Sequence, residues 1–285
     1  MGPMMLRIVI ISLIFTTLAA ELISNASKNQ TSKKTQASIS HETKWLLTKI
    51  HGIAFVFAWF FFVPIAVGSA RYFRDSLTQY TPMGLRLWYH THRTFNLIAA
   101  ALMIVGLATI FVAHEWRWLG PKVGGGSRNY SSTAYHTMFG LFSVLLAWIQ
   151  PFNSLLRCGP RHRLRILFNW AHRSIGIISL LFATTAIYIA CVYFYKHLTS
   201  TTSAIVFCSL CVGVIFVATL MLEFMAWRGR RDKQPLLDDP ESEKHFESST
   251  QVDYQYLVQG AIFAVATALL IAFCSALSAI IAQKD

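Results

Sequence analysis

Long apolar stretches decide what this chain can fold into. They lie at residues 45–70, 87–113, 134–152, 166–195, 203–227 and 256–282, with short polar or basic segments between them. A helix needs roughly 20 such residues to cross the hydrocarbon core of a bilayer. Only helices and closed barrels satisfy all of their backbone polar groups there. The sequence therefore predicts an all-α polytopic membrane protein with six transmembrane helices.

The composition agrees with this class. Hydrophobic residues make up 54% of the chain and charged residues only 13%, whereas soluble domains carry about 25% charged residues. The net charge of +12 could suit nucleic acid. However, the basic residues sit in short segments between apolar stretches, which is the positive-inside pattern of membrane proteins. We therefore expect lipid, and no nucleic acid, as a partner.

The polar segments predict which side of the membrane is outside. Residues 1–20 have the basic start and short apolar run of a signal peptide, with an uncleaved signal anchor as the alternative. Residues 21–44 form a polar arm, expected to be lumenal or extracellular. Glycosylation acceptors Asn25 and Asn29 lie in this arm, and Asn129 lies in the loop after the second helix. All three acceptors fall on the predicted outer side.

The segment 228–255 is then cytosolic, and it carries a sorting motif. Asp232 precedes the pair Leu236 and Leu237 by four positions, as in acidic dileucine signals. Such a signal is an address read by a receptor, not a membrane anchor. It favours delivery to the late endosome or lysosome, with the plasma membrane as the second possibility.

Histidines begin each of the first four helices. His51 and His136 begin the first and third helices at the outer level, and His92 and His172 begin the second and fourth at the inner level. Levelling the inner ends of the first two helices places His92 beside residue 66, roughly 22 Å below His51. Facing imidazoles in a bundle core suit an axially ligated haem iron. A bis-histidine iron has no open position and suits electron transfer.

Two alternatives remain for these residues. Each histidine could be a polar helix-end residue that is hydrogen-bonded within the bundle. His90 also competes for the second position, but its side chain points to a different face from that of His92. The sequence His92-Arg93-Thr94 parallels His172-Arg173-Ser174, which favours His92. We expect the remaining histidines to be solvated or interfacial: His41, His114, His162, His197 and His245.

At these residues the chain resembles the cytochrome b561 family. The resemblance rests on HGIAFVFAWFFFVPIAVGSARYFR, WYHTHRTFN, YHTMFGLFSVLLAWIQPFNSLLR and FNWAHRSIG, within residues 45–196. It is strongest to the branch found in ferric-chelate reductases and in proteins that join this module to a DOMON domain. We expect only the polar arm, and no DOMON domain, before the core.

The resemblance implies a four-helix core bundle holding two haems b. It implies electron transfer from cytosolic ascorbate to a ferric chelate or another outer acceptor such as the ascorbyl radical, often in a homodimer. The implied haem ligands are His51 with His136 and His92 with His172.

Basic residues near the two levels are candidates for contacting the substrates. The inner candidates, for ascorbate or the haem propionates, are Arg71, Arg74, Arg93, Arg165 and Arg173. The outer candidates, for an anionic ferric chelate, are Lys49, His114, Lys122 and Arg128. The inner arginines could instead reflect topology or contact phospholipid.

Two other functions are compatible with a six-helix chain. One is a transporter or channel that uses intramembrane histidines for protons or metal ions. The other is an interaction scaffold with a structural haem. A transporter predicts polar residues at mid-bilayer, but the helix centres here are almost purely apolar. A transmembrane oxidoreductase of the ferric-reductase type is therefore the favoured interpretation.

Overall fold

The computed structural model describes residues 39–76, 78, 80–155, 162–237 and 250–284. Side chains at 154–155, 231–237 and 250–253 are not described. Residues from His41 onward form one compact unit. The predicted signal peptide, most of the polar arm, Asn25 and Asn29 lie outside the described residues.

The described chain is all-helical. Its main helices are α2 (His41–Phe57), η2 (Ala58–Phe62), α3 (Val63–Tyr72), α4 (Leu87–Ala113), α5 (Ser132–Leu155), α6 (Arg165–Tyr193), α7 (Thr201–Leu237) and α9 (Thr250–Ala282). The first three are continuous, so six helices in the described part of the chain are long and apolar enough to cross a membrane. The six-helix prediction is confirmed.

Several helices extend beyond the apolar stretches that predicted them. The first begins at His41, within the stretch expected to be the arm, and α7 runs on to Leu237. The helix α9 begins at Thr250, so most described residues of the expected cytosolic segment are helical. Backbone hydrogen bonding does not require apolar side chains, and Arg, Lys, Gln and Glu are good helix formers. The apolar stretches therefore predict which parts of the helices can cross lipid, but they do not predict where the helices end.

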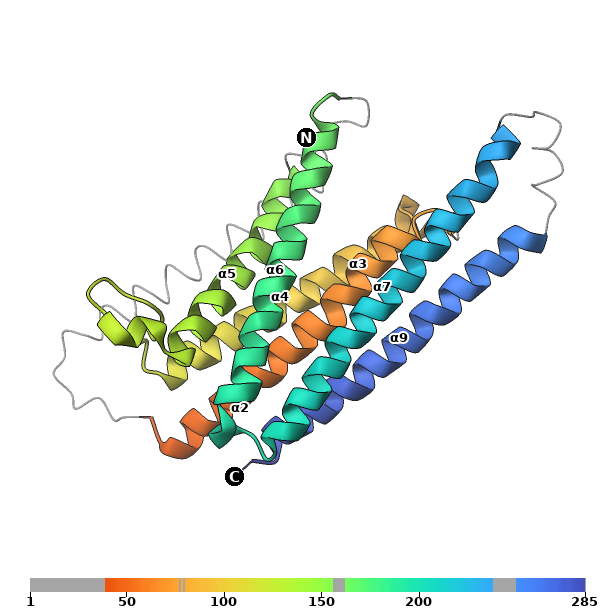
Figure 1. The fold of residues 1–285 in the computed structure, drawn as a ribbon. Helices are drawn as coiled ribbons and strands as arrows, with labels where there is room; N and C mark the ends of the chain where they lie inside the picture. The colour runs from red at the N-terminus through yellow and green to blue at the C-terminus, as the bar shows by residue number, and fades with distance from the viewer. Residues whose placement is uncertain (1–38, 77, 79, 156–161, 238–249, 285) are drawn as a thin grey trace. The chain divides into compact units, whose positions relative to one another are not determined.

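The helices pack in antiparallel pairs. The continuous helix α2–α3 packs along α4, α5 packs along α6, and α7 packs along α9 (Figure 1). The last pair packs against the first four helices: α9 contacts α2, and α7 contacts α6. Backbone approach is close within the pairs α2–α4 and α5–α6 and much sparser between them. Side chains, not backbones, therefore fill the region where these two pairs meet.

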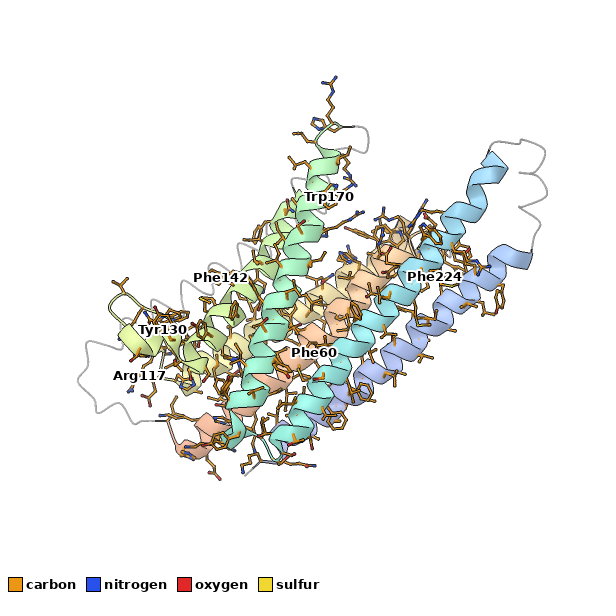
Figure 2. All side chains as sticks on the ribbon, in the orientation of Figure 1. Phe60, Arg117, Tyr130, Phe142, Trp170 and Phe224 are labelled. Carbon is orange, nitrogen blue, oxygen red and sulfur yellow. The ribbon has the colours of Figure 1, made fainter. Side chains whose placement is uncertain are left out.

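The exposure of large apolar side chains is consistent with a bundle that is surrounded by lipid. Phe60 is fully buried among the helices, whereas Phe142, Trp170 and Phe224 are 48%, 66% and 58% exposed (Figure 2). Large apolar side chains on outward helix faces would be costly in water but are favourable in hydrocarbon. The exposed faces of these helices are therefore suited to acyl chains.

A π-helical turn interrupts the first spanning helix just before Pro64. Over Ala58–Phe62 the helix widens, and the Val63 N–H bonds to the Ala58 carbonyl five residues earlier. Proline has no N–H to donate and crowds the preceding turn; such widened turns are one of the known ways to absorb the disturbance. The disturbance caused by Pro64 is thus taken up by a local change of helix type. The turn brings Ala58, Trp59 and Phe60 into the buried core.

Close packing of α2 on α4 depends on Gly106. A Cβ atom there would come within 2.5 Å of the Phe55 ring. We predict that Gly106→Ala destabilises the protein by about 1–3 kcal/mol, as overpacked cores do, measured by thermal unfolding in detergent. Gly213→Ala is the matched control, because a Cβ at that helical glycine meets nothing within 4 Å. Equal stability of the two variants would contradict this packing.

Candidate functional site

Four histidines meet in two pairs, each joining the α2–α4 helix pair to the α5–α6 pair. The rings of His51 and His136 have centroids 6.1 Å apart. Those of His92 and His172 are 6.4 Å apart. The ring planes are inclined by 64° and 63°, respectively. The two pairs therefore share one geometry, at the two ends of the bundle.

Backbone carbonyls hold three of these rings in one orientation. His51 Nδ1 lies 2.9 Å from the Gly106 carbonyl oxygen, and His136 Nδ1 lies 2.9 Å from that of Ala186. His92 Nδ1 lies 3.0 Å from the Ala66 carbonyl oxygen. A carbonyl can only accept, so Nδ1 must donate, and Nε2 keeps its lone pair. Histidines that bind metals are characteristically fixed in this way.

The fourth histidine is held by its surroundings in α5 and α6. The Phe168 ring stacks parallel to the His172 ring, with centroids 6.1 Å apart. The Gln150 side-chain amide donates to the His172 carbonyl oxygen at 3.0 Å, which ties α5 to α6 at this level. The packing of one helix pair thus fixes the position of this ring.

The hydrogen bond from His92 also fixes the depth of the inner pair. Ala66 is the residue that the sequence placed level with His92, and the structure confirms this register. His90 does not join the pair, because its Nε2 lies 2.8 Å from the Pro82 carbonyl oxygen in the preceding turn. In the structure the ring that faces His172 is therefore that of His92 and not that of His90.

A cavity of about 320 Å³ adjoins the outer pair. His51 and His136 line it, together with mainly apolar side chains that include Trp59 and Leu277. Gly140 also lines it, and a Cβ added there would have only the Ala186 Cβ near it, at 3.9 Å. The cavity is of the size and apolar character of small-ligand sites.

His114, Arg117 and His197 line the outer end of this cavity. Burial lowers the pKa of His114, and the Lys44 ammonium lowers it further. Burial likewise lowers the pKa of His197, with smaller contributions from His114 and Lys196. Both shifts favour the uncharged form of the imidazole, so Arg117 is the permanently charged residue among these three.

The other outer candidates lie outside the cavity lining. Lys49, Lys122 and Arg128 are not among the residues that line it. Arg128 donates to the Trp118 carbonyl oxygen at 3.2 Å within the outer loop. Asn129, the described glycosylation candidate, exchanges two hydrogen bonds with the Lys122 backbone, at 3.0 and 2.8 Å.

The inner arginines are held mostly by aromatic rings. The Arg74 guanidinium lies 5.1 Å from the Trp88 ring centroid, that of Arg93 lies 5.8 Å from Tyr89, and that of Arg165 lies 5.7 Å from Phe168. Arg173 is exposed. Arg71 differs from these, because its guanidinium forms an ion pair with Glu223 of α7 at 2.7 Å. Asp232, Leu236 and Leu237 lie in the last turns of α7, and their side chains are not described.

The sequence did not single out Arg117 or Glu223 as site residues, and it placed His197 among the solvated or interfacial histidines. Arg117 and His197 belong to different connecting segments. Only their expected position at the same end of the bundle could have suggested that both line one cavity. Glu223 could have been noticed as an acidic residue inside an apolar stretch, where a charge is costly and usually finds a partner.

Comparison with known proteins gives relatives for part of the chain. It is 28% identical over 144 residues to human ferric-chelate reductase 1, which covers 50% of this chain and 22% of the reductase. It is 27% identical to ferric-chelate reductase 1 of Bos taurus, over 50% of this chain and 22% of that protein. It is 28% identical to a cytochrome b561 and DOMON domain-containing protein of Arabidopsis thaliana, over 53% of this chain and 32% of the relative.

Half of this chain is homologous to these cytochrome b561-type proteins. The resemblance noted in the sequence is therefore confirmed. The chain spans only about a fifth to a third of the length of these relatives. No family model matches the chain, and no solved structure matches it.

The family implies haem, and the histidine geometry fits it. A metal–imidazole bond is about 2.0 Å and a ring nitrogen lies about 1.1 Å from the ring centre, so imidazoles on opposite sides of one metal have centroids about 6.2 Å apart. The observed 6.1 and 6.4 Å bracket this value. The fixed Nδ1 donors and the apolar outer cavity beside Gly140 agree with it. These residues could therefore hold haem iron.

A pair of neighbouring substitutions tests the inner assignment. We predict that His92→Ala lowers the haem bound per chain, because it removes a ring that faces His172. His90→Ala, the control two residues away, is expected to keep the wild-type haem content, because its ring bonds to the Pro82 carbonyl oxygen. The measurement is the haem-to-protein ratio after purification in detergent. Loss of haem from the His90 variant alone would contradict the assignment.

Proposed function

We propose that this chain carries electrons across a membrane through two haems b. The donor is ascorbate on the cytosolic side, and the acceptor on the outer side is a ferric chelate or the ascorbyl radical. The observation that best supports this is the matched pair of histidine sites, His51 with His136 and His92 with His172. Ala66 marks the inner level, fifteen residues along the helix from His51, which is about 22 Å.

The histidine pairs define the kind of chemistry. Two imidazoles on one iron leave no open coordination position, so a haem held in this way supplies a one-electron carrier and no oxygen-binding site. The backbone carbonyls of Gly106, Ala186 and Ala66 keep each Nδ1 protonated and each Nε2 available. This preorganisation fixes the ligands before any cofactor binds.

The core between the two levels excludes water. Ala58, Trp59, Met103 and Val144 are buried there in one apolar cluster. The other cluster on the same helix contains Phe60 and Ile65. An apolar barrier of this kind keeps protons and ions from following the electron across the bundle. It also argues against a polar pathway for transport through the helix centres.

Charged groups at the two ends suit anionic partners. Arg74, Arg93 and Arg165 surround the inner pair, and Arg165 packs on the ring that stacks against His172. A guanidinium fork can donate hydrogen bonds to either an ascorbate anion or a haem propionate. At the outer end, Arg117 lines the cavity, and Glu115 pairs with both Arg117 and Lys44, so this cluster keeps a net positive charge. Electrons would therefore enter at the arginine-rich end.

The cellular setting is part of the same proposal. The dileucine motif at Asp232, Leu236 and Leu237 supports a late endosomal or lysosomal membrane. Asn129 supports glycosylation of the outer loop, and the family resemblance supports a homodimer. In such a compartment the outer end would face the lumen.

Visible spectroscopy tests the proposed function. We expect purified protein to show two low-spin b-type haems per chain, both reduced by ascorbate, because each histidine pair fills both axial positions. A protein purified without haem would refute the proposal. Haem that ascorbate and other cytosolic reductants leave oxidised would favour the structural-scaffold alternative.

The two haem sites can be separated by substitution. We predict that His136→Ala removes the outer haem and halves the haem content, while the remaining haem is still reduced by ascorbate from the cytosolic side. His162→Ala is the control, since His162 lies on the exposed turn before α6. If the substitution instead removes the haem that ascorbate reduces from the cytosolic side, the assumed topology is inverted.

A further inference from the structure

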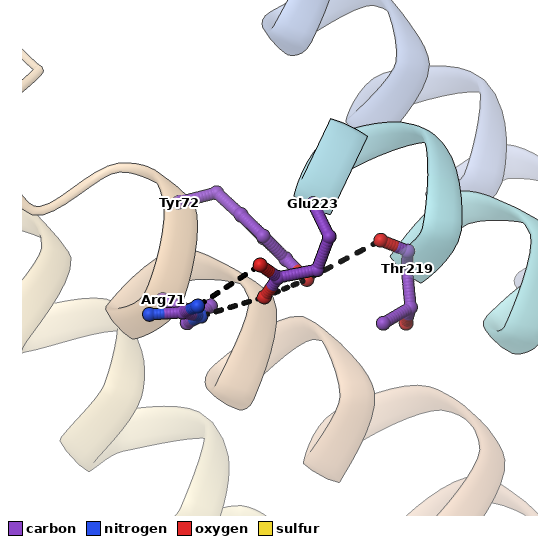
Figure 3. Close-up of polar contacts among 4 residues, drawn as sticks. All are labelled: Arg71, Tyr72, Thr219 and Glu223. Carbon is purple, nitrogen blue, oxygen red and sulfur yellow. Dashed lines mark hydrogen bonds and ion pairs between the residues drawn. The ribbon is translucent and has the colours of Figure 1, made fainter. Parts of the chain in front are cut away.

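A polar cluster joins the first spanning helix to α7 near the inner pair. The Arg71 Nε donates to Glu223 Oε1 at 2.7 Å, and its Nη2 donates to Oε2 at 2.9 Å (Figure 3). The Tyr72 hydroxyl donates to the same Oε1 at 3.1 Å and also lies 3.5 Å from the Thr219 carbonyl oxygen. The guanidinium is thus held by both carboxylate oxygens, which is the strongest geometry for this kind of pair.

The cluster lies close to the inner histidine level. Ala66 is at the depth of His92, and Arg71 follows five residues later on the same helix. That spacing places the Arg71 backbone about 7–8 Å beyond the inner pair, toward the inner end of the bundle. An anion that docks beside Arg71 would therefore also lie near the Glu223 carboxylate.

The neighbouring charges make Glu223 unusual. Described basic residues at this end include Arg74, Arg86, Arg93, Arg165, Arg173, Arg228 and Arg230. Among the described side chains there, the acidic ones are Glu223 and Asp75, and Asp75 faces Arg86 at 3.7 Å. Among the described side chains at this end, Glu223 is therefore the carboxylate that offsets Arg71.

Stability does not account for this pair. The Arg71 and Glu223 side chains are 43% and 37% exposed, and half-exposed ion pairs contribute little to folding. Their electrostatic effect on a bound anion is of similar size in free energy, but it acts directly on the affinity for that anion. A unit charge about 7 Å from an anion changes its binding constant about threefold even at the dielectric constant of water, and more at a protein surface.

We propose that Glu223 sets the affinity of the inner site for its anionic electron donor. By holding Arg71 in a bidentate pair, it removes that cation from the donor and weakens donor binding. The helix α7 is then a working part of the inner site, with Glu223 as a positioning residue that acts through Arg71. This inference rests on the proposed function, because it requires an anionic donor at this end.

The isosteric variant Glu223→Gln tests the inference in the full-length, haem-loaded protein. Glutamine keeps an acceptor for Tyr72, removes the charge and replaces the second acceptor oxygen with a donor, so the bidentate hold on Arg71 is lost. We expect the KM for ascorbate to fall at least about threefold, with kcat unchanged and with a smaller effect at high salt. The KM for a neutral hydroquinone should not change. Glu42→Gln, the same substitution at the outer end, should leave the KM for ascorbate at its wild-type value.

A second pair of variants separates electrostatics from packing. Arg71→Gln leaves the carboxylate unpaired and should raise the KM for ascorbate at least about threefold. The double variant Arg71→Gln with Glu223→Gln should return close to the wild-type KM, because the net charge of the cluster is restored. If the double variant keeps a raised KM, Arg71 contacts the donor directly and the inference is wrong.

Two further results would overturn it. One is an unchanged KM for ascorbate in Glu223→Gln. The other is a parallel change for ascorbate and the neutral hydroquinone together with loss of haem, which would mark a purely structural tie between α3 and α7. Failure of the proposed function would look different, because wild-type protein itself would then not be reduced by ascorbate.

Discussion

The hydrogen bonds from histidine Nδ1 to backbone carbonyls are the interactions on which the site depends. Each of these three bonds joins the two helices of one antiparallel pair: His51 to Gly106, His92 to Ala66 and His136 to Ala186. The two rings of each site, in contrast, come from different helix pairs. Packing within a pair therefore orients the ligands, and packing between the pairs brings them face to face. A carbonyl acceptor also determines which nitrogen is free.

This arrangement explains why so much of the site could be predicted. Helix existence followed from apolar length, and antiparallel order followed from short connections. The level of His92 then followed from counting residues, and the bond to Ala66 agrees with it. The choice between His90 and His92 rested on a local sequence parallel. The structure adds a physical reason why His90 does not face His172: its ring is hydrogen-bonded to the Pro82 carbonyl oxygen in the preceding turn.

Other parts of the site could not be predicted, because they depend on contacts between distant segments. Arg71 and Glu223 are 152 residues apart, and no periodicity reports which face α7 presents to α3. The cavity lining by His197 depends on where the turn after α6 comes to lie. Helix ends were also misjudged, since α7 and the first helix continue through polar residues that hydrophobicity assigns to loops.

The last two helices give the protein features that a four-helix core would lack. The helix α9 packs on α2, and Leu277 of α9 lines the outer cavity. Cys208 and Cys211 of α7 are fully buried, and the Cys211 sulfur lies 4.0 Å from that of Cys274. At the inner end, Glu223 of α7 pairs with Arg71. These two helices therefore contribute residues near both the outer and the inner histidine pair, in addition to covering the core with apolar surface.

The central claim is that each histidine pair binds one iron from both sides. Electron paramagnetic resonance of the oxidised, purified protein tests it most directly, because low-spin and high-spin ferric haem give distinct signals. The account predicts two low-spin signals in equal amount, one of which disappears in His136→Ala and the other in His92→Ala. A high-spin signal in the wild-type protein, or a single signal that both substitutions abolish, would contradict it.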